Sequence, residues 1–353
     1  MSDNKGESFS ADIGAAGLSG IELWTRDGFN GEVCAMVRPN YSPDFLSAVG
    51  THVPRSFNLT ELPTADNSDA EAQPLLVADS RQGVRLSVSR RSQPMPFVMR
   101  NVEADEIHFI QQGQLRFHTD CGLLEAGPGD FVSIPKSIAY RVVPLSTSSC
   151  SLIVESPAPF RVDAPVGLIN AARDVHYARL EAAETPAEGP VTLLLKAHDG
   201  ITRFLMPHDP LTAVAHVFGA VPVWKVNLAQ IQVVTFMPNG GGPPAQFITS
   251  QGNDVMLFNL SARQNNTRSP IHLNTDYDEL VLFFRGPGAW GGVSDPGNLT
   301  WVPKGIVHHG PTENIPEGYM AWLMESRATF RLTPEALAAS ALINTSSFSP
   351  HAD

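Results

Sequence analysis

The stretch from Ser269 to Gly286, SPIHLNTDYDELVLFFRG, decides the fold. It contains Glu279, then six residues, then Gly286, which is the pattern of one strand that ends in a tight turn. The stretch from Gly297 to His309, GNLTWVPKGIVHH, follows with Gly-x5-Pro-x-Gly and a histidine after two more residues. This second pattern predicts the returning strand, which brings its histidine back beside the first strand.

Both spacings occur again in the first half of the chain. Glu106 is followed by six residues and Gly113, and Gly129 is followed by five residues, Pro135-x-Ser137, two residues and Tyr140. A repeat of this kind predicts two copies of one structural unit. Short apolar runs between turn residues predict strands of the first copy at 84–88, 106–110, 114–118 and 130–134.

The composition indicates a globular protein that is rich in turns. The chain has 353 residues, of which 42% are hydrophobic and 17% are charged, and this length suits about two domains. Its 28 Gly and 29 Pro indicate short elements, so we expect an all-β protein with a few short helices, at 170–188 and 334–342. The net charge of −12, without a Lys/Arg cluster, argues against nucleic acid and anionic membranes as partners.

The N-terminus and the cysteines predict a cytoplasmic location. Residues 1–20 are polar and small and form a predicted flexible tail without the pattern of a signal peptide. No apolar run is long enough to cross a bilayer. Cys34, Cys121 and Cys150 are few and lack CxxC spacing, so we expect reduced thiols that fill the core.

The two repeated spacings resemble the two sequence motifs of the cupin superfamily, and their duplication resembles a bicupin. The resemblance implies two double-stranded β-helix (jelly-roll) barrels. We expect a tail at 1–20, a barrel without metal at 21–165, a linker with a helix at 166–225 and a metal-binding barrel at 226–353.

The second copy carries the residues with metal-ligand character. They are His272, Glu279 and one of His308 and His309. Two imidazoles and one carboxylate on a rigid sheet suit a divalent first-row metal and leave coordination positions open, as non-haem Fe(II) chemistry with O₂ requires. In the first copy the corresponding positions hold Met99, Asn101, Glu106 and Tyr140, so we expect no metal there and a hydrogen-bonded Glu106.

Several stretches resemble the homogentisate 1,2-dioxygenase family, a resemblance that includes its branch of hydroquinone dioxygenase large subunits. They are VWKVNL at 223–228, SPIHLNTDYDELVL at 269–282, His-Gly-Pro at 309–311 and GYMAWLMESRATFRLT at 318–333, together with 105–142 in the first copy. The family opens the ring of a para-diphenol with O₂ on Fe(II). The resemblance implies that His272, Glu279 and His309 hold the metal.

Two ligand positions stay open at this stage. The family places five residues between its first histidine and its glutamate, a gap that reaches Asp278 here, whereas Glu279 fits the strand and turn. The general cupin spacing selects His308, and the His-Gly-Pro run of the family selects His309. Adjacent residues of a strand face opposite sides, so one of the two histidines is expected to be a ligand.

Other residues are candidates for the reaction itself. His308 and His216 are predicted acid–base groups, because imidazole titrates near neutral pH. Asn274 lies two residues from His272 and is expected on the same strand face, as a weak ligand or a hydrogen-bond donor. Trp290 and Tyr319 are predicted to contact an aromatic substrate.

The sequence therefore predicts an Fe(II)-dependent extradiol-type dioxygenase that acts on homogentisate, hydroquinone or a related aromatic compound. A metal-dependent bicupin isomerase or decarboxylase, and a non-catalytic binding or assembly subunit, are the alternatives. We expect a homo-oligomer, or a hetero-oligomer with a smaller subunit, as relatives in the superfamily commonly form.

Overall fold

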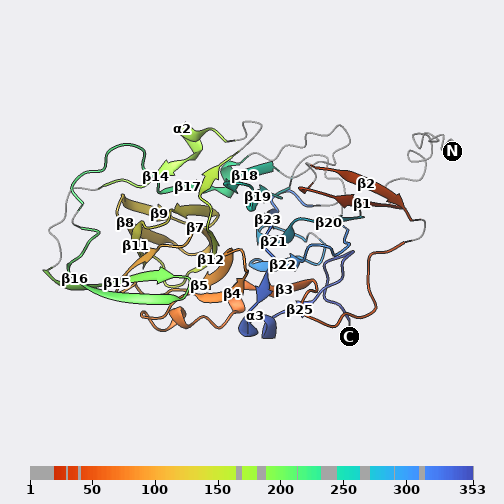
Figure 1. Cartoon of the computed structure of the whole chain (residues 1–353), viewed down its shortest axis with the longest axis horizontal. Helices are drawn as coiled ribbons and strands as arrows, with labels where there is room; N and C mark the ends of the chain where they lie inside the picture. Colours follow the sequence, from red (N-terminus) through yellow and green to blue (C-terminus); the bar gives the residue numbers. More distant parts are fainter. Residues whose placement is uncertain are drawn as a thin grey trace.

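The chain forms two β-barrels that lie side by side (Figure 1). The computed structural model describes residues 20–28, 31–38, 41–163, 169–180, 188–212, 214–231, 245–262, 271–289, 291–309 and 315–352. Strands dominate these residues and the helices are short, as predicted for an all-β bicupin.

The first barrel consists of two sheets. In order across the first sheet the strands are β14 (His176–Tyr177), β17 (Trp224–Asn227), β10 (Asp130–Ile134), β7 (Asp105–Gln112), β12 (Cys150–Ser156), β5 (Arg85–Ser89), β4 (Leu75–Asp79) and β24 (Arg331–Leu332). Across the second they are β16 (Gly200–His208), β15 (Glu188–Ala197), β6 (Val98–Asn101), β11 (Ala139–Pro144), β8 (Leu115–Thr119) and β9 (Gly122–Ala126). The four strands predicted from apolar runs correspond to β5, β7, β8 and β10.

The second barrel is built in the same way. Its large sheet has the order β13 (Phe160–Val162), β18 (Ala245–Ser250), β19 (Val255–Asn259), β23 (Met320–Ser326), β21 (Asp278–Arg285), β22 (Asn298–Val302), β3 (Arg55–Asn58) and β25 (Ala341–Leu342). Its small sheet has the order β2 (Val33–Val37), β1 (Ile21–Thr25) and β20 (Ile271–Asn274).

The helices are shorter than predicted. The prediction at 170–188 corresponds to α2 (Ala171–Asp174), which is capped by the side chain of Asn170, and residues 181–187 lie outside the described part. The prediction at 334–342 corresponds to α3 (Pro334–Ala338), with Thr333 as its N-cap. The 3-10 helices are η2 (Leu59–Glu61), η3 (Ala65–Asn67) and η4 (Leu228–Gln230). Much of the predicted linker at 166–225 is strand instead, because β14 to β16 and part of β17 fall within it.

The barrels exchange strands at their ends, which corrects the contiguous division predicted from the sequence. β1 pairs with β20, and β3 pairs with β22, so the N-terminal strands belong to the second barrel. In return, β24 near the C-terminus pairs with β4 of the first barrel. Backbone pairing of strands far apart in sequence carries no local signal, so the motifs could not reveal this exchange.

An aromatic core joins the two large sheets. Phe109 of β7 lies with its ring centroid 5.1 Å from that of Trp322 in β23 and 5.5 Å from that of Phe284 in β21. Since side chains alternate along a strand, the residues next to these core positions in β7 and β21 point the opposite way, into the barrels. Glu106 and His108 therefore face the inside of the first barrel, and Glu279 and Val281 face the inside of the second.

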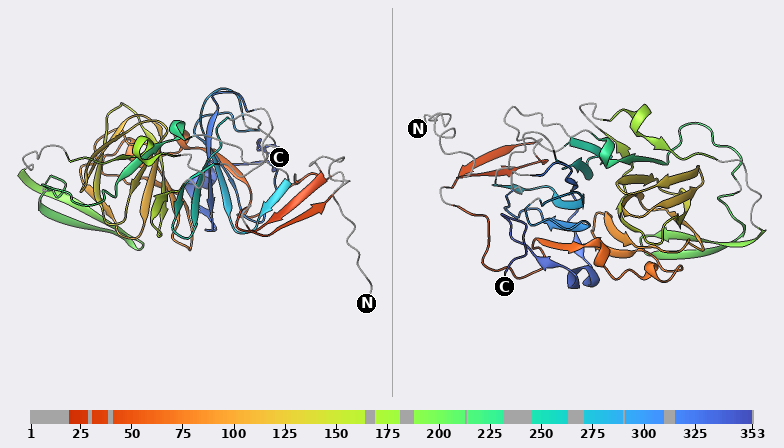
Figure 2. Two further views of the ribbon diagram at one scale, coloured as in Figure 1. Left: turned by 90° about the horizontal axis from the view of Figure 1, so that it is seen from above. Right: turned by 180° about the vertical axis from the view of Figure 1, so that it is seen from behind.

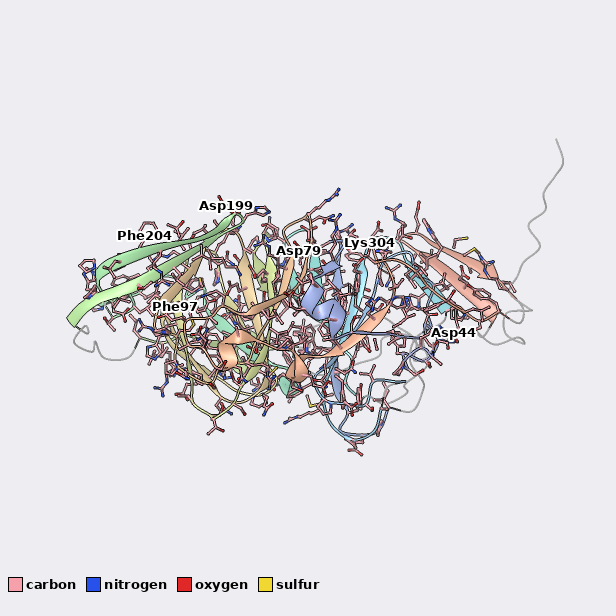
Figure 3. The ribbon with its side chains drawn as sticks, turned by 90° about the horizontal axis from the view of Figure 1, so that it is seen from below. Asp44, Asp79, Phe97, Asp199, Phe204 and Lys304 are labelled. Carbon is pink, nitrogen blue, oxygen red and sulfur yellow. The ribbon has the colours of Figure 1, made fainter. Side chains whose placement is uncertain are left out.

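Each barrel carries a hairpin at its outer end (Figure 2). β15 runs parallel to β6 and pairs with β16, and β1 runs parallel to β20 and pairs with β2. Figure 3 shows Phe204 on the outer hairpin of the first barrel and Phe97 beneath it. Phe204 is 45% exposed, whereas Phe97 is buried.

The homo-oligomer or hetero-oligomer expected from the sequence stays a prediction.

Two of the three cysteines are buried, as predicted, and the third is not. Cys121 and Cys150 lie in the core of the first barrel region, and burial raises the pKa of the Cys150 thiol to about 12. Cys34 lies exposed on β2, which corrects the expectation that it fills the core. Among the described residues, no helix has the length and apolar character needed to span a membrane.

Candidate metal centre

Two backbone segments of the second barrel bring two histidines together. His272 in β20 donates its N–H to the carbonyl oxygen of His308 at 2.8 Å, and His308 returns the bond at 2.9 Å. Residues that exchange both bonds in an antiparallel pair project their side chains to the same face. The two imidazole centroids accordingly lie 4.2 Å apart.

Glu279, the second residue of β21, completes the cluster. One possible ligand atom from each of His272, Glu279 and His308 lies within 4.8 Å of the other two. Within the described part of the chain, this is the one such group of three His, Cys, Asp or Glu side chains. His272 and His308 are buried and Glu279 is nearly so.

The hydrogen bonds prepare His308 for a metal. Its Nδ1 lies 2.9 Å from the carbonyl oxygen of Ile306, and because a carbonyl only accepts, Nδ1 carries the hydrogen and donates. Its Nε2 is buried, and the nearest carboxylate atom, Oε2 of Glu279, is 3.4 Å away. That separation exceeds a good N–H···O distance, so Nε2 is suited to bind a cation between the two side chains.

The electrostatics favour positive charge at this point. Burial acts against a charged His308, but the nearby carboxylate of Glu279 outweighs it and raises the His308 pKa. Burial also disfavours a charged Glu279, but His308, His272 and Asn274 outweigh it and hold the Glu279 pKa below its usual value. A proton or a metal ion between Nε2 and Oε2 satisfies both groups. The nitrogen, nitrogen and carboxylate donors fit a divalent first-row metal.

Neither neighbouring alternative belongs to the cluster, and this differs from the expectation that His309 is the third ligand. His309 is absent from the cluster, and its backbone N–H donates to Thr345 at 2.8 Å. Asp278 is fully buried on the other face of β21, where it accepts hydrogen bonds from Trp301 Nε1 and from the N–H of Phe330. Strand alternation therefore selects His308 over His309 and Glu279 over Asp278.

Asn274 orients the carboxylate of Glu279, and Thr25, which is far away in sequence, orients Asn274. Asn274 donates from Nδ2 to Oε2 of Glu279 at 3.1 Å, as expected from its place on the face of His272. Thr25 of β1 donates its hydroxyl to Oδ1 of Asn274 at 3.3 Å and so fixes which way the amide faces. The hydroxyl of Thr25 also lies 3.2 Å from the carbonyl oxygen of Leu273. Sequence reasoning missed Thr25, because it is 249 positions away from Asn274 in the chain.

A second buried carboxyl lies beside the cluster. Glu325 of β23 is the register partner of Glu279. Burial, followed by the charges of Glu279 and Asp27, raises the pKa of Glu325 to about 8. The repeat contained a signal for it, since Val154-Glu155-Ser156 and Met324-Glu325-Ser326 occupy the same place in the two copies.

The same point of the first barrel holds a network of hydrogen bonds. Glu106 accepts bonds from Asn101 Nδ2 at 2.8 Å and from the Tyr140 hydroxyl at 2.8 Å, and His108 Nε2 lies 2.9 Å from its Oε2. Met99 takes the position of His272. The prediction that Glu106 is an inward, hydrogen-bonded group is confirmed.

The remaining predicted residues lie apart from the cluster or in the core. His216 is exposed on the segment between β16 and β17 of the first barrel, so it is not placed as an acid–base group for the cluster. Tyr319 is fully buried and stacks on Phe283, with ring centroids 4.4 Å apart. Trp290 lies outside the described residues.

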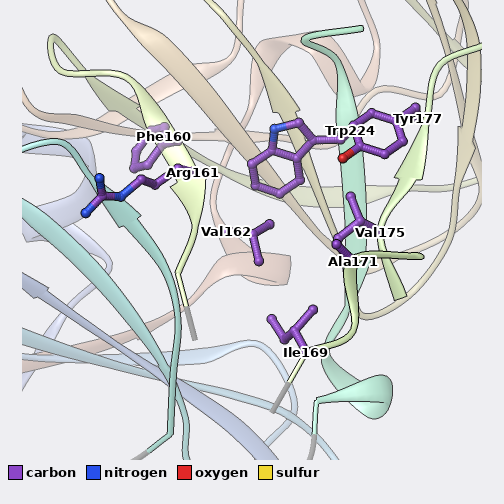
Figure 4. Close-up of a pocket in the computed structure, with 8 residues that line it drawn as sticks. All are labelled: Phe160, Arg161, Val162, Ile169, Ala171, Val175, Tyr177 and Trp224. Carbon is purple, nitrogen blue, oxygen red and sulfur yellow. The ribbon is translucent and has the colours of Figure 1, made fainter. Parts of the chain in front are cut away.

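A separate hollow lies between the barrels (Figure 4). It has a volume of about 460 Å³ and is lined by residues from β13, α2, β14 and β17, among them Phe160 and Trp224. None of its lining residues belongs to the cluster, and it is therefore separate from the candidate metal centre.

Comparison with known proteins confirms the resemblance read from the sequence. The chain is 26% identical over 288 residues to homogentisate 1,2-dioxygenase of Bradyrhizobium diazoefficiens, covering 69% of this chain and 60% of that protein. It is 28% identical over 176 residues to the same enzyme of Pseudomonas putida, covering 49% of this chain and 39% of that protein. The chain thus spans about 60% or less of the length of these relatives. No family model matches it.

Solved structures with a related arrangement include cupin barrels. A deletion mutant of Bacillus subtilis oxalate decarboxylase is 12% identical, with a TM-score of 0.41 over 83% of this chain and 80% of that chain. A cupin 2 conserved barrel domain protein from Leptotrichia buccalis is 11% identical, with a TM-score of 0.38 over 82% of this chain and all of that one.

Proposed function

We propose, from the similarity of this chain to homogentisate 1,2-dioxygenases, that its second barrel holds Fe(II) in an extradiol-type dioxygenase that cleaves the ring of a para-diphenol. The ligands are His272, Glu279 and His308. Their convergence within 4.8 Å on the inside of one barrel is the observation that carries this proposal. Bound by these three side chains, Fe(II) would leave coordination positions open for a phenolate oxygen and for O₂ and would supply the redox chemistry of ring opening.

The protein groups around these ligands hold them in place. The carbonyl oxygen of Ile306 fixes the tautomer of His308, and Asn274 holds one oxygen of Glu279. Groups that hydrogen-bond to ligands set their orientation and basicity. Thr25 adds a third level of support, because its bond to Asn274 keeps the amide nitrogen directed at the carboxylate.

Apolar and aromatic side chains lie beside the ligands of the second barrel. The ring of Phe348 lies 6.3 Å from that of His308, at 86° to it. Phe348 belongs to an apolar cluster with Val281, Phe283 and Tyr319. In the proposed reaction, apolar side chains of this kind would contact the ring of the diphenol. Contact of Tyr319 or Trp290 with the substrate stays a prediction.

Oxygen consumption tests the proposal. The full chain is loaded with Fe(II) under anaerobic conditions and mixed with oxygenated homogentisate, gentisate or hydroquinone. We expect O₂ uptake with at least one of them, in a one-to-one ratio with the diphenol consumed. His272→Ala should remove both bound iron and uptake, whereas His216→Ala, a change at an exposed histidine of the first barrel, should retain both. No uptake with any of the three compounds contradicts the proposal.

A further inference from the structure

The first barrel contains a cavity at the point that corresponds to the metal centre. Its volume is about 150 Å³. Met99, Glu106 and Tyr140 line it, and these residues occupy the positions of His272, Glu279 and His308 in the second barrel. The cavity is also lined by one apolar side chain, Ile153, and by two charged ones, Glu155 and Lys196.

The polar end of this cavity keeps hydrogen-bonding capacity. Lys196 Nζ donates to Oε1 of Glu155 at 2.6 Å, and Asn101 donates to its Oε2 at 3.0 Å. A lysine ammonium has three N–H donors, and each carboxylate oxygen accepts two bonds. The pair of Lys196 and Glu155 can therefore donate one bond to a ligand and accept another from it.

The charges at this end select a neutral ligand. Glu106 and Glu155 repel an anion, while Lys196 and Arg85, which also line the cavity, repel a cation. A neutral hydroxyl group avoids both costs, since it donates to Glu155 and accepts from Lys196 at the same time.

The apolar walls and the volume select a single ring. Met99, Ile153, Leu76 and Ile201 supply apolar contact, and the methionine sulfur favours aromatic neighbours. A cavity of about 150 Å³ is large enough to hold benzene. We propose that the first barrel binds a neutral monocyclic phenol, whose hydroxyl bonds to Glu155 and Lys196 and whose ring contacts Met99 and Ile153.

This second site does not depend on the proposed reaction. It lies in the other barrel and requires neither metal nor O₂ for binding. Absence of phenol binding in the first barrel can therefore be distinguished from absence of dioxygenase activity, which is measured by oxygen uptake.

Methyl NMR of the full chain tests the site. The chain carries ¹³C-methyl methionine and is freed of metal with a chelator, and Met99→Leu assigns the Met99 signal. We expect phenol to shift this signal saturably through the ring current of the bound molecule. Benzoate and benzylamine, an anion and a cation of similar size, should bind at least about tenfold more weakly.

A pair of filling variants locates the bound phenol. Ile153→Phe occupies the cavity and should weaken the phenol response about tenfold or more. Leu323→Phe is the matched change in the second barrel and should leave the Met99 titration unaltered. A Met99 signal that phenol does not move contradicts the proposal, as does equal binding of benzoate. If Ile153→Phe fails to fold, the ligand series on the unchanged chain still decides.

Discussion

The first and second barrels hold a glutamate at the same point of the fold but surround it with different side chains. Glu279 lies against the imidazoles of His272 and His308, whereas Glu106 receives bonds from the Tyr140 phenol and the Asn101 amide. Both barrels keep the asparagine on the strand that precedes the glutamate. The difference lies in the side chains at the positions of the two histidines and in His108, which lies 2.9 Å from Glu106 where the second barrel has Val281.

Each barrel has a second buried carboxylate, but only that of the first barrel is paired with a lysine among the described residues. Glu155 pairs with Lys196, which comes from the hairpin strand β15. In the second barrel the corresponding carboxylate is Glu325, and the strand position of Lys196 holds Thr25, which has no charge. Burial, followed by the charges of Glu279 and Asp27, raises the pKa of Glu325 to about 8. Under the proposed function, a bound cation would supply in the second barrel the positive charge that Lys196 supplies in the first.

The largest expected effect separates the two adjacent histidines. His308→Ala should abolish stoichiometric iron binding and lower the rate of O₂ uptake about 10³-fold, since a catalytic metal stabilises charge by several kcal/mol. His309→Ala is the matched control and should retain the iron. Metal analysis and oxygen-electrode rates measure both. Iron loss in His309→Ala alone would restore His309 as the ligand.

The internal lysine gives the next largest effect, on stability. Lys196→Met leaves the buried Glu155 without its cation, and we expect a loss of about 2–4 kcal/mol in the free energy of unfolding. This is below the range for fully buried pairs, because the Lys196 side chain is 25% exposed. Thr25→Val, the matched change, should cost about 1 kcal/mol. Urea unfolding measures both, and equal costs would contradict the charge comparison.

The two asparagines should differ in what their removal changes. Asn274→Ala should weaken metal affinity about 10–100-fold, because the amide orients Glu279. Asn101→Ala should leave metal affinity unchanged and lower the free energy of unfolding by about 1–3 kcal/mol, since two buried carboxylates lose a donor. Competition with a chelator and urea unfolding distinguish the two outcomes. A fall in metal affinity for Asn101→Ala would show that the barrels are coupled.

The smallest expected effect is a pH dependence confined to the first barrel. Burial disfavours a charged Glu106, but the bond and charge of His108, the charge of Lys196 and Asn101 outweigh it and lower its pKa from 4.5 to about 2. The lowered pKa stabilises the fold above pH 4.5, and this contribution is lost as the pH falls toward 2. Glu106→Gln should therefore flatten the profile of unfolding free energy between these values. A profile parallel to that of the unchanged chain would contradict the lowered pKa.

Local patterns in the sequence were enough to predict several strands, the duplication and most of the candidate metal centre, and the resemblance to the cupin motifs implied the barrels. Turn residues and alternation predicted β5, β7, β8 and β10, and the repeat predicted two copies. His272 and Asn274 lie in β20 and Glu279 lies in β21, the next strand along the chain, so their spacing carried the information. The choice between His308 and His309 needed the backbone pairing of His308 with His272, which no spacing specifies.

The sequence by itself determined which residues alternate toward each barrel interior, because the side-chain period of a strand is a property of the backbone. Only the tertiary structure decided which distant strands complete each barrel. The placement of Thr25 beside Asn274, of Lys196 beside Glu155, and of β24 in the first barrel arises from long-range packing and backbone pairing. Such contacts join residues that have no fixed separation along the chain, so a local pattern contains no trace of them.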